Sequence, residues 1–328
     1  NGNPEVVVDP NGQTTTSTWD ELNRVKSKTF TAASDGARPW RYTTGLAYAY
    51  DLNGNLGPIE EHVASGSSPP DTTLVSARTY DGLDRLASET QALPEGGNRT
   101  LSYTYFRNGT RKAVTDPEGR VTRYVYDGQN RLQSATTDFG SADARITTYG
   151  YWPDDLLRTV TYPNAVVATH GYDKADRVLS ITNAKDATAI SSFQYSGTHP
   201  TTGLPAAYDA NGNRLIQVET NGGTTETTGY GYDDLDRLAS VTYPVDTTYP
   251  QGRLVSYGHD AVGNRIRETE KDSADVVLAD KQGIFDNANR LTGLLDLVTP
   301  ANGTTFTWDK NGNQITKTTA GVTTENRY

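Results

Sequence analysis

The sequence contains neither cysteine nor methionine, and it has only four histidines. Without cysteine, the chain has no disulfide framework and no thiolate metal site. No apolar run approaches the roughly 20 residues that a membrane-spanning helix needs. These absences exclude disulfide scaffolds and helical membrane spans, but they leave both a cytoplasmic and a secreted location open.

The charge balance is acidic. The chain carries 30 basic and 40 acidic residues, with a formal net charge of -10 and an isoelectric point near 4.9. Its basic residues are spread evenly along the chain, whereas a phosphate-binding surface needs them clustered. The composition therefore argues against nucleic acid and anionic membranes as partners.

Hydrophobic residues are scarce, at 34% of the chain. A compact domain of about 300 residues buries about 75% of its unfolded surface and needs a thicker apolar core. Disorder is disfavoured because 20 Tyr, 6 Phe and 4 Trp recur at regular places. A broad, thin sheet with at least one wet face fits both observations.

A short motif built around an aromatic residue and aspartate recurs along the whole chain. In its short form, two variable residues follow this pair, and then come Asn or Asp, Arg and an aliphatic residue. The six copies of this form contain Trp19, Asp20 and Arg24; Tyr80, Asp81 and Arg85; Tyr126, Asp127 and Arg131; Tyr172, Asp173 and Arg177; Tyr232, Asp233 and Arg237; and Phe285, Asp286 and Arg290.

A second form carries Gly-Asn before the arginine. It occurs at Tyr208, Asp209 and Arg214, at His259, Asp260 and Arg265, at Trp308 and Asp309 with Gln314 for Arg, and, shortened, at Tyr50 and Asp51. Degenerate copies lie at residues 105–111 and 151–157. The two forms then alternate over twelve copies spaced 21 to 36 residues apart, which indicates a repeat array with a structural unit of two repeats.

Turn and strand signals alternate between these motifs. Asp9-Pro10-Asn11-Gly12, Asp116-Pro117-Glu118-Gly119 and Tyr249-Pro250-Gln251-Gly252 predict further turns, because Pro presets one turn position and Gly supplies a positive φ. The segments between turns are rich in Thr, Val and Tyr, which favour strands. We therefore predict an all-β fold in which repeated antiparallel hairpins form one continuous spiralling sheet, a shell or a solenoid.

The whole chain, residues 1–328, is expected to be a single array of about twelve repeats. Because it begins at Asn1 and stops at Tyr328 within what resembles another repeat, we interpret it as a piece of a longer polypeptide. Segments 65–71 and 195–205 are expected to be surface loop insertions. Helix is nearly absent, and Leu294–Val298 is the best candidate for a helical turn.

The motif residues have a structural explanation. The aspartate can accept bonds from backbone N–H groups of its own turn. The arginine can reach that aspartate or lie over the next aromatic ring. Stacked repeats would align these side chains into ladders, each pair contributing on the order of 0.2–1 kcal/mol. The motif is thus explained as a stacking device.

Candidate chemical sites are weak. No His-Glu-x-x-His or Gly-x-Ser-x-Gly pattern occurs, and His199, in the larger insertion, is the one histidine that merits a test, although a solvated loop histidine is the commoner case. The Asp209 and Asp309 turns resemble calcium loops only faintly, since Gly is fourth rather than sixth. Neither a catalytic, a cofactor nor a metal site is predicted, and exposed aromatics could stack on sugars. Sequons at Asn98, Asn108 and Asn302 matter only in a secreting eukaryote.

The aromatic-Asp copies followed by Arg-Leu, the Asp-Pro-x-Gly turns and the period of about 26 residues resemble the YD-repeat or Rhs family. That family includes bacterial Rhs toxins, the BC components of Tc toxin complexes and animal teneurins. The resemblance covers Asp9 to Tyr328 and implies a β-strip that spirals into a hollow cocoon, which encloses a toxic segment in the bacterial members. Asp116-Pro117-Glu118-Gly119-Arg120 resembles the family's self-cleavage site, but Arg stands where that site has Leu, so we read it as an internal turn.

The resemblance implies a non-catalytic scaffold of a secreted or cell-surface protein that encloses a toxin or other cargo. The alternative is an extended extracellular filament or adhesin that binds carbohydrate or protein. The expected partners are neighbouring repeats of the same or identical chains, with an enclosed toxin or a surface ligand. No cofactor, nucleic acid or membrane span is expected.

Overall fold

The computed structural model describes residues 2–31, 41–65, 72–94, 96–246, 248–250 and 252–326. Twenty-six strands belong to one antiparallel sheet, and two short strands form a separate small sheet. The chain divides into two compact units, Asn1–Thr147 and Thr148–Tyr328. The expected all-β architecture of antiparallel hairpins is confirmed.

In unit 1, each strand pairs antiparallel with the next strand in the chain, from the first to the last. The strands are β1 (Val6–Val8), β2 (Thr14–Trp19), β3 (Val25–Phe30), β4 (Arg41–Tyr50), β5 (Leu56–Ser65), β6 (Thr72–Tyr80), β7 (Leu86–Ala92), β8 (Asn98–Tyr105), β9 (Arg111–Thr115), β10 (Val121–Tyr126) and β11 (Leu132–Thr137).

Unit 2 follows the same rule, except that β16 pairs with β19. Its strands are β12 (Arg145–Tyr151), β13 (Leu157–Thr161), β14 (Val167–Tyr172), β15 (Val178–Lys185), β16 (Thr188–Gln194), β17 (Gly197–Thr198), β18 (Pro205–Ala206), β19 (Ile216–Asn221), β20 (Thr224–Tyr232), β21 (Leu238–Tyr243), β22 (Arg253–His259), β23 (Arg265–Asp272), β24 (Val277–Phe285), β25 (Leu291–Asp296), β26 (Thr304–Trp308), β27 (Gln314–Thr319) and β28 (Val322–Glu325).

The predicted helical turn at Leu294–Val298 is wrong. β25 runs to Asp296, and Leu294 pairs with Thr304 of β26. This pairing fixes an extended backbone, so the apolar run Leu294-Leu295 continues the sheet. Within the described residues, the single helical element is a 3-10 turn, η1 (Pro300–Asn302), which begins on a proline.

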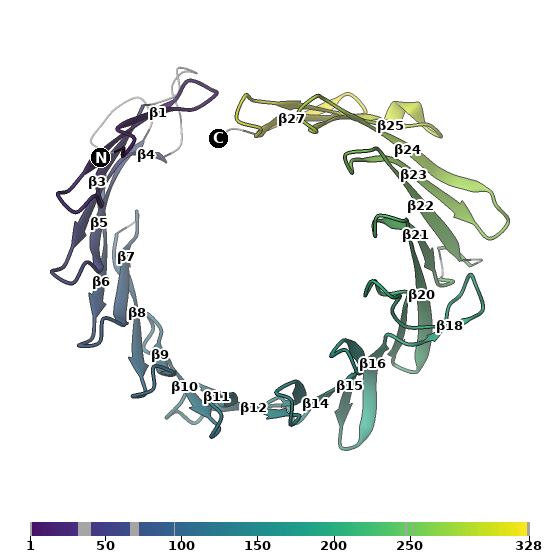
Figure 1. Cartoon of the computed structure of the whole chain (residues 1–328), viewed down its shortest axis with the longest axis horizontal. Coiled ribbons are helices and arrows are strands. Elements are labelled where there is room, and N and C mark those ends of the chain that lie inside the picture. Colours follow the sequence, from purple (N-terminus) through teal and green to yellow (C-terminus); the bar gives the residue numbers. More distant parts are fainter. Residues whose placement is uncertain are drawn as a thin grey trace. The chain divides into compact units, whose positions relative to one another are not determined.

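Each unit is a strip one sheet thick, with its strands following chain order (Figure 1). Side chains alternate between the two faces of such a strip. One face, here called the tyrosine face, carries the motif aromatics and residues such as Tyr230, which lies opposite Val241. The other face, the threonine face, carries cross-strand hydroxyl pairs at 2.6–2.8 Å, namely Thr18 with Ser27, Thr79 with Ser88, Thr307 with Thr316 and Thr318 with Thr323.

Burial is shallow because a single layer has no second sheet to pack against. The buried apolar side chains of the described residues are Val63, Val160, Ala168, Ile216, Val241 and Val255, and only Ile216 is fully buried. Stability therefore rests on the ladder of backbone hydrogen bonds and on side-chain contacts between adjacent turns.

The two expected insertions differ in outcome. Segment 65–71 lies outside the described residues, apart from Ser65 at the end of β5. Segment 195–205 contains β17 and, together with β18, forms a small hairpin. In unit 2 this hairpin lies on the convex side of the curved strip (Figure 1). It packs on the threonine face at Gly229, where an added Cβ would lie 2.8 Å from Pro200 Cγ.

The close approach of Pro200 to Gly229 predicts that a larger side chain at position 229 destabilises the protein. Gly229→Ala should lower the free energy of unfolding by about 1–3 kcal/mol, because the new methyl group overpacks against Pro200 and His199. Urea unfolding measures the change. Gly82→Ala is the control, because no atom lies within 4 Å of the added Cβ there. Equal stability of the two variants would contradict the packing described.

Candidate functional site: the edge of aromatic-Asp turns

The twelve motif copies close the same loop. In every copy, the residue after the aromatic donates its N–H to the carbonyl four residues later, at 2.8–3.0 Å. Its own carbonyl accepts the N–H three residues later, at 3.0–3.2 Å. This geometry belongs to a three-residue hairpin loop whose last residue is left-handed and forms a bulge. Because the copies occupy every second turn of the meander within each unit, they share one edge of its strip.

The two sequence forms differ at the left-handed position. The four Gly-Asn copies place glycine there, at φ 86–95° in Gly54, Gly212, Gly263 and Gly312, and the degenerate copy at residues 105–111 does the same with Gly109 at 89°. The short copies place Asn or Asp there, at φ 58–62° in Asn23, Asp84, Asn130, Asp176, Asp236 and Asn289. Asn and Asp tolerate this backbone better than other non-glycine residues.

The loops of the Gly-Asn copies therefore have the same length as the loops of the short copies, and the copy at Tyr50 is not shortened. Their closing residue is an asparagine, as in Asp209 to Asn213, where the short form has arginine. Arg214 and Arg265 stand one residue later and belong to the return segments. Arg214 forms a bridge with Tyr208, and Arg265 begins β23. They are not equivalent to Arg24.

In the ten copies that contain it, the motif aspartate ties the loop together. One carboxylate oxygen of Asp233 accepts the backbone N–H groups of Leu235 and Arg237, both at 3.0 Å. The other oxygen accepts Arg237 Nε at 2.7 Å. The same three contacts occur around Asp20, Asp81, Asp127, Asp173 and Asp286.

In the Gly-Asn copies, an asparagine amide takes the place of the guanidinium. Asn213 Nδ2 donates to Asp209 at 2.9 Å, and the equivalent bonds join Asn55 to Asp51, Asn264 to Asp260 and Asn313 to Asp309. These donors favour the charged carboxylate. The Asn213 amide thus lowers the pKa of Asp209, and the backbone N–H of Arg237 lowers the pKa of Asp233. The pKa values of Asp20, Asp51, Asp81, Asp127, Asp173, Asp260 and Asp286 are lowered as well.

Arginine links a short copy to the Gly-Asn copy that follows it. Arg237 Nη1 donates to the carbonyl of Asp260 at 2.8 Å, and Arg290 Nη1 donates to that of Asp309 at 2.9 Å. Where the next aromatic is tyrosine, the guanidinium also lies over its ring. The carbon-to-centroid distances are 4.3 Å for Arg24 over Tyr50, 4.7 Å for Arg85 over Tyr105 and 4.6 Å for Arg177 over Tyr208.

Asparagine links a Gly-Asn copy to the next short copy. Asn211 Nδ2 and Asn213 Nδ2 both donate to Asp236 Oδ1, at 2.8 and 2.7 Å. The acceptor is the left-handed residue of the next loop. The same junction joins Asn53 and Asn55 to Asp84, Asn108 to Asn130, and Asn264 to Asn289. The alternation of forms therefore corresponds to two alternating kinds of junction.

The motif aromatics add a third link, back to the preceding copy. Tyr80 Oη donates to the carbonyl of Leu56 at 2.8 Å, and Trp308 Nε1 donates to that of Leu291 at 2.8 Å. In each case the acceptor is the residue just after the preceding loop. Five more copies do the same through Tyr50, Tyr105, Tyr172, Tyr208 and Tyr232.

The sequence patterns did not predict the asparagine hydrogen bonds that join neighbouring motif copies. The sequence places arginine near aspartate within one motif, but the acceptors at Asp84, Asp236 and Asn289 lie in the next motif. The available signal was the pairing itself: a Gly-Asn copy is followed by a copy whose left-handed residue is Asn or Asp.

The histidines are dispersed. His62 lies on β5, His170 on β14 and His259 at a motif aromatic position on β22. His199, for which solvation was the commoner expectation, is buried at 9% exposure because its hairpin folds onto the strip. Among the described residues, no group of three or more His, Cys, Asp or Glu is placed to hold a metal ion. In the same part of the chain, no helix is long and apolar enough to cross a bilayer.

The Asp-Pro-x-Gly turns use the motif's loop geometry on the opposite edge. Asp116 N–H donates to the carbonyl of Arg120 at 2.9 Å, and the Asp116 carboxylate accepts Arg120 Nε at 2.6 Å. This segment is a turn between β9 and β10. In the predicted turn Tyr249-Pro250-Gln251-Gly252, which has Tyr in place of Asp, Gly252 N–H donates to the carbonyl of Tyr249, and Gln251 lies outside the described residues.

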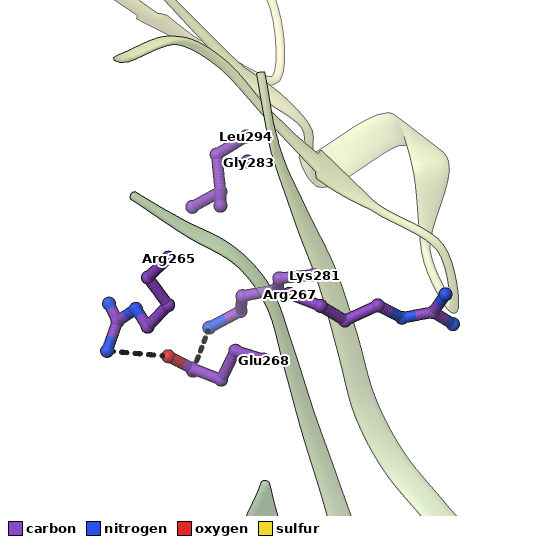
Figure 2. A pocket seen from close by; sticks show the side chains of 6 residues that line it. All are labelled: Arg265, Arg267, Glu268, Lys281, Gly283 and Leu294. Carbon is purple, nitrogen blue, oxygen red and sulfur yellow. Dashed lines mark ion pairs between the residues drawn. The ribbon is translucent and has the colours of Figure 1, made fainter. Parts of the chain in front are cut away.

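A cavity of about 160 Å³ lies on the tyrosine face of unit 2 (Figure 2). Glu268 forms ion pairs with Arg265 at 3.3 Å and with Lys281 at 3.8 Å. Arg267 extends to the opposite side, where its Nε donates to Asp280 at 2.8 Å. The charged groups thus pair with one another, and they form no nucleophile-base arrangement. Gly283 and Leu294 complete the lining.

The chain matches one family model and several solved structures. The family model described as RHS Repeat matches residues 107–142 and 208–248. No curated protein matches this chain.

Solved structures match over 97% of this chain. The TcdB2-TccC3 complex has a TM-score of 0.60 at 14% identity over 19% of its chain, and the same complex without its hypervariable C-terminal region has 0.61 at 14% over 18%. The Tc holotoxin pore of Photorhabdus luminescens has 0.53 at 13% over 20%. At these identities the matches establish the fold, and this chain spans about a fifth of the length of each.

The aromatic link is tested by Tyr80→Phe. Losing the bond from Tyr80 Oη to Leu56 should lower the free energy of unfolding by about 1 kcal/mol in urea titrations. Tyr103→Phe is the matched control, because the described contact of Tyr103 is with Arg111 over its ring. An equal loss in the free energy of unfolding of both variants would show that the bond from Tyr80 Oη to Leu56 adds no stability of its own.

The motif aspartates predict acid sensitivity. Their pKa values are lowered in the folded state, so their contribution is complete above the unfolded-state value near 3.9. It is lost as the pH falls through the lower folded-state values. Urea titrations should give constant aspartate-linked stability from about pH 7 to about 4.5 and a steep fall below about pH 4. Asp233→Asn should flatten part of that fall, and an unchanged profile would contradict the assignment.

Proposed function

We propose that the chain, parts of which match the RHS Repeat family model, is a non-catalytic structural segment of a secreted or surface protein, forming part of a β-shell around a toxin or other cargo. The observation that carries this proposal is the use of the motif side chains. The Asp, Arg, Asn and aromatic groups that could do chemistry are engaged in closing turns and joining neighbouring turns.

The character of the two faces supports the same role. In unit 2 the tyrosine face is the concave side, because the 195–205 insertion packs on the threonine face and lies on the convex side (Figure 1). Tyrosines and paired charges such as Arg253 with Glu270 at 3.0 Å give this side a polar, aromatic lining. Such a lining suits contact with a polypeptide cargo that must later be released.

The solved neighbours suggest the source of the cargo. One of them is a TcdB2-TccC3 complex described as lacking a hypervariable C-terminal region. We propose that the cargo here is a variable segment of the same polypeptide that contains this chain. The other partners proposed are neighbouring repeats of the same or identical chains, and the site of action is extracellular or at the cell surface.

The test uses the full-length gene product. Electron microscopy should give closed hollow particles, and an enclosed segment should resist protease until the particles are unfolded by heat. Long uniform fibres would overturn the shell and favour the filament or adhesin. In the same preparation, hydrolase substrates based on glycans and peptides should give no turnover. Turnover that disappears in His199→Ala would overturn the non-catalytic assignment.

A further inference from the structure

The cavity on the tyrosine face of unit 2 has no part in the proposed function. Its hollow arises at Gly283, which lies opposite Leu294 on the neighbouring strand and has no side chain to fill the space. An added Cβ at Gly283 would lie 2.8 Å from the carbonyl oxygen of Arg265 and 2.9 Å from Phe285 Cε2, so the packing leaves room only for glycine. The backbone of the sheet therefore builds the hollow.

Three charged side chains meet at this cavity (Figure 2). The Glu268 carboxylate pairs with both Arg265 and Lys281, and its side chain is 27% exposed, whereas theirs are 57% and 40% exposed. Two cations thus share one anion, which leaves one net positive charge beside the hollow. The local sign is opposite to that of the chain, whose formal net charge is -10.

The ion pairs use few of the donors that these cations carry. A guanidinium has five N–H groups and an ammonium has three. Arg265 Nη1 lies 3.3 Å from Glu268, and the 3.8 Å between Lys281 Nζ and Glu268 is too long for a hydrogen bond. Asp296, opposite Lys281 on β25, uses its Oδ1 to accept the N–H groups of Val298 and Thr299. Both cations can therefore bind a second carboxylate.

The other side chains at the cavity are apolar or aromatic. Leu294 projects from β25 toward the charged groups (Figure 2). The Arg265 guanidinium lies over the Tyr257 ring, with 5.1 Å from its carbon to the ring centroid. The cavity volume of about 160 Å³ is close to the volume of about 150 Å³ at which an engineered apolar cavity binds benzene. The space therefore fits a body of one six-membered ring.

We propose that this cavity binds a carboxylate carried on a small apolar body, with the carboxylate at Arg265 and Lys281 and the body against Gly283 and Leu294. Carboxylates form charge-assisted hydrogen bonds with both kinds of cation, and burial of the body adds apolar contact. Two sources offer this chemistry. One is a free aromatic or aliphatic acid, and the other is the terminal carboxylate of a polypeptide that ends in an apolar residue.

Benzoate tests the proposal on the full chain at low ionic strength, because salt screens contacts with exposed charges. NMR titration of methyl groups should show saturable binding with a Kd on the order of millimolar, the scale for a ligand of this size. Benzamide, the neutral isostere, should bind about threefold more weakly or less. Acetyl-Gly-Gly-Phe with a free carboxyl terminus separates the sources. Binding tighter than that of benzoate assigns the site to a polypeptide terminus, and weaker binding assigns it to a free acid.

Substitutions separate binding in the cavity from general attraction to the surface. Arg265→Gln and Lys281→Gln should each weaken benzoate binding about two- to fivefold, because each removes one exposed charge contact. Glu268→Gln should tighten binding by a similar factor, because it removes the carboxylate that competes for both cations. Lys317→Gln is the matched control and should leave binding unchanged, since Lys317 lies opposite Phe306 on the tyrosine face, outside the cavity lining.

Absence of saturable benzoate binding, or equal binding of benzoate and benzamide, would overturn the proposal. Unchanged affinity in both Arg265→Gln and Lys281→Gln, or weaker binding in folded Glu268→Gln, would overturn it as well. If the variants do not fold, nuclear Overhauser contacts in the unaltered chain give a second test. The benzoate ring should contact the Leu294 methyl groups, and contacts confined to other methyl groups would refute the site.

Discussion

The fold depends on one carboxylate in each of the ten motif turns that carry an aspartate after the aromatic residue. A thin sheet has little apolar core, so its turns must define where each strand ends and the next begins. Asp233 and its counterparts do this by accepting two backbone N–H groups and one side-chain donor across the three-residue loop that follows each of them. That arrangement fixes the bulge and sends the aromatic and the arginine or asparagine toward adjacent turns. The strip is thus held by repeated local geometry rather than by a buried centre.

Much of this was predictable because it is local. The aromatic-Asp pairs, the strand-forming segments and the Gly or Asn turn residues gave the hairpins, and the Asp20–Arg24 type of contact spans only four residues. The longer contacts were not predictable in the same way. Asn211 meets Asp236 only because β19 to β20 return the chain to the same edge 25 residues later. His199 and Leu294 were misjudged for a similar reason, since packing on Gly229 and pairing with β26 decide their surroundings.

The alternation of arginine and asparagine junctions constrains how such an array can change length. Deleting one hairpin would place two Gly-Asn loops side by side, so an asparagine amide would face a glycine instead of a carboxylate or amide oxygen. Alternatively, it would place two short loops together and leave the second without its amide donor. Deleting two hairpins preserves every junction. Insertions and deletions in the lineage of this protein should therefore be tolerated in pairs, and the array grows or shrinks by even numbers of repeats.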